Sequence, residues 1–108
     1  MADVTYVEIG PVERFPSRIG VRVQAGNEEI VVFRLTDGRV VALENRSPHR
    51  KGGIISEGMV SGEYLYDPLY DWKISLMTGE VQAPDNGQVK VYPVLVEAGK
   101  ISIGMDSR

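Results

Sequence analysis

The feature of this sequence that most constrains its fold is a series of short apolar segments separated by turn residues. Most of them alternate apolar and polar side chains or are rich in Val, Ile and Tyr, which is typical of β-strands. No long window shows the 3.6-residue apolar period of a helix, and we expect at most one helical turn, near residues 12–15. The pattern therefore predicts an all-β fold, an antiparallel β-sandwich or small barrel. The segments run over 4–9, 20–24, 29–36, 39–44, 63–67, 72–76, 89–97 and 100–103.

Turn residues lie between these segments. Asp37-Gly38 separates two apolar runs and predicts a hairpin with a type I′ turn. Gly26-Asn27, Asn86-Gly87 and Ala98-Gly99 are further turn dipeptides, and we expect residues 77–80 to close another hairpin. The 108 residues contain no repeat, low-complexity tract or linker, so we expect a single domain over 1–108.

Composition excludes several classes of partner and site. The net charge of −3 argues against nucleic acid as the main partner, because phosphate binding needs a basic face. No apolar run approaches the ~20 residues that span a membrane, and the N-terminus does not have the pattern of a signal peptide. We therefore expect a cytoplasmic protein. The chain has no Cys, which excludes disulfides, thiolate nucleophiles and cysteine-ligated iron–sulfur clusters.

One stretch, residues 45–62, interrupts the strand pattern and carries Pro48, Gly52, Gly53, Gly58 and Gly62. A long Gly-rich loop inside a small domain is usually functional. Its charge is also uneven. Residues 45–53 carry the basic residues Arg46, Arg50 and Lys51 and no acidic residue. The charged residues of 54–72 are all acidic. The two stretches are either solvated loop faces or the two halves of an electrostatic contact surface.

The motifs in this region resemble those of the Rieske iron–sulfur family, whose members carry Cys-Pro-His in one loop and Cys-Pro-x-His-Gly-Trp in a second. Here the first loop reads Ser47-Pro48-His49, and the second reads Asp67-Pro68-Leu69-Tyr70-Asp71-Trp72. The resemblance implies a Rieske-like fold with two cluster-type loops. Other frame residues that match the family pattern are Gly53, Gly58, Thr78 and Gly79.

The same resemblance places the four cluster ligands at Ser47, His49, Asp67 and Tyr70, and only His49 keeps the family's residue type. A Rieske cluster holds one iron by two thiolates and the other by two imidazoles. Ser and Tyr hydroxyls are protonated near neutral pH, and a carboxylate lacks the softness of a thiolate. We therefore expect no cluster or other cofactor in this chain.

The four side chains leave three other interpretations open. They could form a mononuclear metal site, although a facial triad needs a second His and the chain has one. Ser47, His49 and Asp67 are also the residue types of a catalytic triad. The interpretation we favour is that hydrogen bonds among the four now join loops that metal joins in the family, since buried polar groups need partners. We expect no catalytic residue here.

A Rieske-like domain without its ligands is similar to the small subunits of bacterial assimilatory NAD(P)H-dependent nitrite reductases. That resemblance implies an accessory subunit in nitrate assimilation. It also implies a large-subunit partner that carries sirohaem, an iron–sulfur cluster and FAD and reduces nitrite to ammonium. The loop tip of His49, Arg50 and Lys51 is a candidate partner contact. The alternatives are a Rieske-type ferredoxin of an oxygenase and a free-standing binding or regulatory module.

Overall fold

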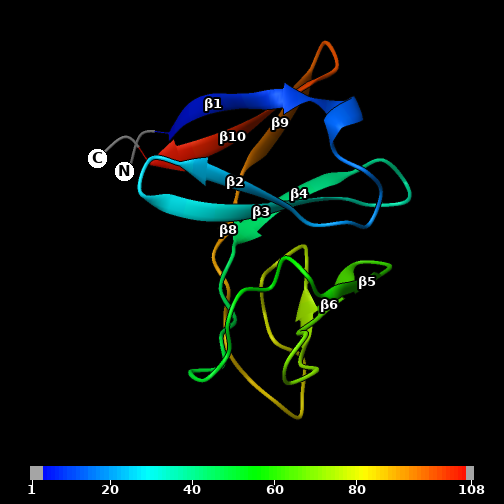
Figure 1. The fold of residues 1–108 in the computed structure, drawn as a ribbon, viewed down its shortest axis with the longest axis vertical. Helices are drawn as coiled ribbons and strands as arrows, with labels where there is room; N and C mark the ends of the chain where they lie inside the picture. Colours follow the sequence, from blue (N-terminus) through cyan, green and yellow to red (C-terminus); the bar gives the residue numbers. More distant parts are fainter. Residues whose placement is uncertain (1–3, 107–108) are drawn as a thin grey trace.

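The computed structural model describes residues 4–106, which form three antiparallel sheets (Figure 1). The sheets are ordered β1-β10-β9, β2-β3-β4-β8 and β5-β6-β7. The predicted all-β fold is confirmed, and the predicted single helical turn is a 3₁₀ turn, η1. The elements in chain order are β1 (Val4–Pro11), η1 (Val12–Arg14), β2 (Val21–Ala25), β3 (Glu28–Arg34), β4 (Val40–Glu44), β5 (Met59–Ser61), β6 (Tyr64–Tyr66), β7 (Lys73–Ser75), β8 (Val91–Tyr92), β9 (Val94–Glu97) and β10 (Lys100–Asp106).

Strand β3 is buried on both faces, which explains its unbroken apolar run Ile30-Val31-Val32-Phe33. Successive side chains of a strand point to opposite faces of the sheet. Ile30 and Val32 belong to one core, which the sheet β1-β10-β9 completes from one side. Val31 and Phe33 belong to a second core, which is completed by residues from the lobe around β5, β6 and β7.

The two cores correspond to the two parts of the molecule in Figure 1. The sheets β1-β10-β9 and β2-β3-β4-β8 form a sandwich in the upper part of the view, and residues from the end of β4 to the start of β8 form a lobe below it. The lobe is mostly loop, but it contributes Ile55, Leu65, Ile74 and Leu76 to the second core, all fully buried. Apolar burial therefore fixes the lobe on the sandwich.

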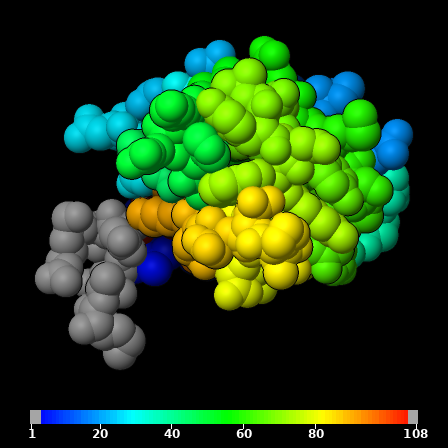
Figure 2. Space-filling view, turned by 90° about the horizontal axis from the view of Figure 1, so that it is seen from below, coloured from blue at the N-terminus to red at the C-terminus, as the bar shows by residue number. Residues whose placement is uncertain are grey.

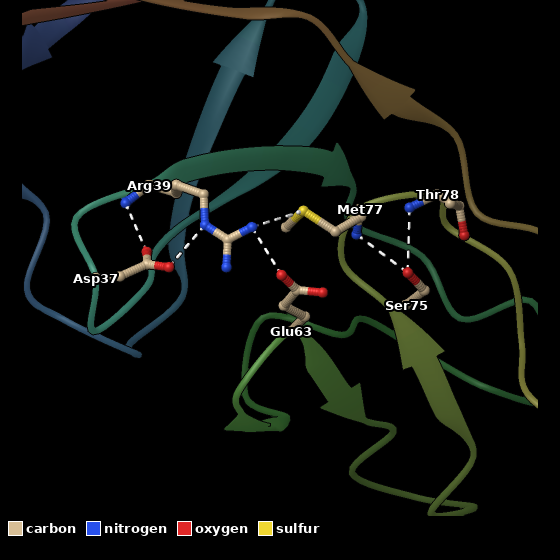
Figure 3. A network of polar contacts seen from close by, with 6 residues as sticks. All are labelled: Asp37, Arg39, Glu63, Ser75, Met77 and Thr78. Carbon is tan, nitrogen blue, oxygen red and sulfur yellow. Dashed lines mark hydrogen bonds and ion pairs between the residues drawn. The ribbon is translucent and has the colours of Figure 1, made fainter.

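Arg39 adds a polar connection between the two parts (Figure 3). It lies in the turn between β3 and β4, where its Nε donates to Asp37 Oδ2 at 2.8 Å. Its Nη1 lies 2.7 Å from Glu63 Oε2 in the β5–β6 turn and 3.4 Å from Met77 Sδ beyond β7. The Glu63 and Asp37 carboxylates raise the pKa of Arg39. The guanidinium thus joins the sandwich to two turns of the lobe.

Two of the predictions about strands are wrong. The segment predicted as one strand over 89–97 divides at Pro93 into β8 and β9, which belong to different sheets. Proline has no N–H to donate to a sheet, so it is suited to the point where the chain leaves one sheet for another. The stretch 45–62, predicted as one loop, contains the short strand β5 (Met59–Ser61).

The predicted type I′ turn at Asp37-Gly38 is also wrong. Gly38 has a φ of +95°, but Asp37 is not among the residues of positive φ, and a type I′ turn needs both. The N–H of Gly38 donates to Leu35 O at 3.0 Å, and the N–H of Leu35 donates to Arg39 O at 2.8 Å. These bonds define a three-residue hairpin loop with glycine at its last position.

No helix within residues 4–106 is long and apolar enough to cross a membrane.

Candidate functional site

Two loops of the lobe carry the residues singled out in the sequence. Loop 1 (residues 45–58) connects β4 to β5, and loop 2 (residues 67–72) connects β6 to β7. Figure 2 looks onto the lobe end of the molecule, where the surface is formed by the green to yellow part of the chain. The structure brings the four positions of interest together, because Ser47 contacts Asp67 and His49 contacts Tyr70.

Loop 1 begins at Asn45, a buried residue outside the motifs that resemble the family. Its Oδ1 accepts the N–H groups of Ile55 and Ser56, both at 2.9 Å, and its Nδ2 donates to Glu29 Oε2 at 2.7 Å. The Arg22 guanidinium and the Asn45 amide lower the pKa of Glu29. One side chain therefore closes the base of loop 1 and attaches it to β3. The sequence signal that could have identified this role is an Asn directly after a predicted strand.

Ser47 and Asp67 form the buried contact between the two loops. The Ser47 hydroxyl donates to Asp67 Oδ2, and the two residues are 5% and 3% exposed. The other carboxylate oxygen, Oδ1, accepts the N–H groups of Leu69 at 2.8 Å and Tyr70 at 3.1 Å. Asp67 thus orders loop 2 and contacts loop 1 at the same time. A carboxylate that accepts this many hydrogen bonds is satisfied without a cation.

His49 and Tyr70 meet by ring stacking rather than by a hydrogen bond. Their ring centroids lie 3.8 Å apart with an interplanar angle of 9°. Trp72 also contacts the His49 ring, in a T-shaped arrangement with the ring centroids 4.9 Å apart. The Nδ1 of His49 accepts the N–H of Lys51 at 3.0 Å, which orients the ring. This geometry fixes the tips of both loops relative to each other.

Gly52 is a position in loop 1 where a side chain does not fit. A Cβ there would lie 2.3 Å from Ser47 Oγ and 2.4 Å from Ser47 Cβ. The N–H of Gly52 also donates to His49 O at 2.8 Å, and the N–H of Ser47 donates to Gly53 O at 2.7 Å. The loop therefore folds back over Ser47 closely enough to bury its hydroxyl against Asp67.

The contacts do not follow the order of a catalytic triad. In a triad the imidazole lies between the hydroxyl and the carboxylate, whereas here Ser47 donates directly to Asp67. The His49 Nδ1 accepts a backbone N–H, and its ring contacts two aromatic side chains. Within residues 4–106, no three His, Asp or Glu side chains are grouped so as to hold a metal ion. The site is organised for joining two loops.

Arg50 and Lys51 follow His49 at the tip of loop 1, and both are exposed. Neither forms an ion pair within the described part of the chain. Leu69, next to Tyr70 at the tip of loop 2, is 65% exposed. The tips therefore present unpaired positive charge and apolar surface beside the stacked rings.

Comparisons with known proteins agree with this architecture. A stretch of 96 residues is 31% identical to part of the nitrite reductase [NAD(P)H] large subunit of Klebsiella oxytoca, covering 85% of this chain. The chain spans only 10% of that relative's length. It is 22% identical over 104 residues to the ferredoxin component of an alkene monooxygenase system from Xanthobacter autotrophicus, covering 96% of this chain and 84% of the relative.

Among solved structures, one similar fold is that of a protein from Mycobacterium tuberculosis assigned as an NADH-dependent nitrite reductase small subunit. The two superpose with a TM-score of 0.87 at 23% identity, over 98% of this chain and 99% of that one. The model of the Rieske-like [2Fe-2S] domain family matches residues 5–104, nearly the whole chain. This match shows that the chain belongs to the Rieske-like [2Fe-2S] domain family.

Proposed function

We propose that this domain is a non-redox accessory small subunit that binds the large subunit of an assimilatory nitrite reductase, which reduces nitrite to ammonium with NAD(P)H. The observation that carries the proposal is the buried Ser47–Asp67 hydrogen bond, which joins the two family loops in a chain without Cys. No catalytic residue is assigned to this chain. Its contribution is a surface on a scaffold that the family otherwise uses to hold a redox centre.

The residues present do not fit a [2Fe–2S] cluster. A Rieske cluster needs two thiolates for one iron and two imidazoles for the other, and this chain offers one imidazole and no thiolate. At the positions that correspond to thiolates, Ser47 and Asp67 are each other's hydrogen-bond partners. At the positions that correspond to imidazoles, His49 and Tyr70 are stacked face to face. We therefore assign no cluster to this chain.

Support for the partner comes from the Klebsiella oxytoca large subunit. This chain is similar to a segment that makes up 10% of that protein. A segment similar to this domain is part of the same polypeptide as that reductase. A domain that shares a polypeptide with an enzyme in one protein can contact the corresponding enzyme as a subunit in another. The large subunit that we propose as partner carries sirohaem, an iron–sulfur cluster and FAD.

A pull-down with the large subunit tests the proposal. The tagged domain is expected to retain the large subunit, detected by sirohaem absorbance in the bound fraction, and to alter its nitrite reductase activity. The absence of both effects would show that the domain is a free-standing module or serves another enzyme.

The similarity to an alkene monooxygenase ferredoxin favours a second candidate, an electron carrier for an oxygenase. Iron analysis of the purified domain separates the two candidates. We expect a colourless protein with no stoichiometric iron, whereas two irons per chain and a visible iron–sulfur spectrum would establish the ferredoxin.

We further propose the loop tip of His49, Arg50 and Lys51 as a contact with the large subunit. Arg50 and Lys51 are exposed and form no ion pair within residues 4–106, and charge at an interface rim guides association and orientation. The double variant Arg50→Glu and Lys51→Glu is expected to weaken complex formation at low salt. Equal binding of variant and wild type would exclude the tip from the interface.

A further inference from the structure

A second feature of the lobe surface is a groove of about 480 Å³ beside loop 2. We call it the acidic groove. Its residues come from the end of loop 1, from β5, from β6 and from loop 2, and they are Glu57, Met59, Tyr66, Asp67, Pro68 and Asp71.

The groove carries two carboxylates that form no ion pair among the described residues. Glu57 and Asp71 are exposed, and neither forms an ion pair within residues 4–106. Asp67 differs, because it is buried and its oxygens accept hydrogen bonds from Ser47, Leu69 and Tyr70. The stretch 54–72 contains no Lys or Arg, and Lys73, which follows it, lies over the Tyr64 ring with its Nζ 4.3 Å from the ring centroid.

The same groove has apolar walls. Met59 projects from β5 and is 72% exposed, the largest exposure among the large hydrophobic side chains described. Tyr66 is half-buried and Pro68 is exposed. A groove with apolar walls and two free carboxylates matches the side chain of Arg or Lys, whose aliphatic stem packs on apolar surface while its charged end reaches an acid.

The acidic groove shares loop 2 with the stacked tip. Asp71 directly follows Tyr70, which stacks on His49, and Arg50 directly follows His49. A base therefore follows one ring of this aromatic contact in the chain, and an acid follows the other. A partner that meets this end of the molecule in one orientation brings acids to one side and bases to the other, which fixes its register.

Resting on the proposed function, we propose that the acidic groove takes a basic side chain of the nitrite reductase large subunit, held between Glu57 and Asp71 with its stem on Met59. The contact determines the orientation of the complex, because it complements the basic tip at Arg50 and Lys51. The groove is thus the second half of the docking surface.

The test compares two doubly neutralised variants in titrations with the purified large subunit at low salt. Glu57→Gln with Asp71→Asn removes the charge of the groove. The φ of Asp71 is +57°, a conformation that Asn also tolerates, so the loop is preserved. Glu8→Gln with Glu13→Gln is the matched control, since both are exposed acids on β1 and η1.

We expect the groove variant to bind about tenfold more weakly and with a flatter salt dependence, and the control to bind like wild type. Met59→Ala is expected to weaken binding as well, whereas Met59→Leu restores it. Equal affinity of groove variant and control overturns the groove assignment alone. A wild-type domain that does not bind the large subunit overturns the proposed function as well.

Sedimentation of the isolated domain checks the identity of the occupant, because the basic tip of a second copy carries the matching charge. We expect a monomer. A dimer that the groove variant abolishes would assign the groove to a second copy of this chain and would overturn the large subunit as its occupant.

Discussion

At the scale of single residues, the small side chain of Ser47 makes contacts on which both loops depend. Its hydroxyl donates to the buried Asp67 carboxylate and also accepts the N–H of His49 at 3.1 Å. Both loops depend on it, because Asp67 holds the backbone of loop 2 while Gly52 packs against Ser47 from loop 1. Removing this one oxygen leaves a buried carboxylate with one partner fewer.

We therefore predict that Ser47→Ala lowers the free energy of unfolding by about 1–3 kcal/mol, the cost of leaving a buried polar group without its partner. Urea denaturation measures it. Ser61→Ala is the control, since Ser61 is exposed on β5 and its loss is expected to change stability by less than about 0.5 kcal/mol. Equal stability of the two variants would show that the Ser47–Asp67 contact is replaceable.

The site could be anticipated from the sequence in its residues but not in its contacts. The loop motifs identify Ser47, His49, Asp67 and Tyr70 as neighbours, and the structure places them together. That His49 stacks on Tyr70 depends on side-chain rotamers and on the approach of Trp72. The role of Asn45 depends on where the chain returns ten residues later, at Ile55, and local sequence does not specify that return.

At the scale of elements, the turn of the hairpin β9–β10 has a backbone conformation that suits only one of its two residues. Ala98 and Gly99 form the two-residue connection, with φ values of +51° and +75°. Two positive φ values define a type I′ turn, for which Asn-Gly is the preferred pair. Ala98 carries a Cβ in the left-handed region, which costs about 1 kcal/mol or more for an L-residue.

We predict that Ala98→Asn raises the free energy of unfolding by about 0.5–1 kcal/mol, because Asn tolerates the left-handed conformation better than Ala. Ala98 is exposed, so the new side chain displaces nothing. Ala98→Val is the opposing variant and is expected to destabilise, since a β-branched residue is poorly suited to positive φ. A shift of both variants in the same direction would contradict this account of the turn.

The elements themselves were predictable where side-chain pattern and burial coincide. The run Ile30 to Phe33 predicts a strand because each residue is buried on one of the two faces of β3. β5 was not predicted because only Val60 of its three residues is buried. Met59 and Ser61 are exposed, and a glycine lies on each side of the strand. The division at Pro93 was not predicted because apolar residues lie on both sides of it, although the residues before it belong to one sheet and those after it to another.

At the scale of the whole molecule, the surface carboxylates are not equivalent. Several of them are paired in the folded state, and their pKa values are lowered. The Tyr92 hydroxyl lowers the pKa of Glu28, the Arg22 guanidinium that of Glu29, and the Arg39 backbone N–H that of Asp37. These carboxylates lie on β3 and in the β3–β4 turn, whereas Glu57 and Asp71 on the lobe have no ion-pair partner in the described part of the chain.

The paired carboxylates predict how stability depends on pH. A carboxyl whose pKa is lower in the folded chain than in the unfolded chain stays ionised longer in the folded state, so the unfolded state takes up protons first as the pH falls. Its stabilising contribution is complete above its unfolded pKa and is lost as the pH falls through its folded pKa. We therefore expect the urea midpoint to be nearly constant from pH 8 to about pH 5.5 and to decline below about pH 4.5.

The variant Glu29→Gln with Asp37→Asn is expected to have a shallower decline below about pH 4.5 than wild type, because two of the groups that cause it no longer titrate. Added salt should reduce the difference, since both pairs are exposed and screened. Glu8→Gln with Glu13→Gln is the control and should retain the wild-type slope, because neither residue forms an ion pair within residues 4–106. If both double variants decline equally, the acid sensitivity arises from the net charge of the chain rather than from the pairs on β3 and in the β3–β4 turn. It would then follow the total number of carboxylates removed.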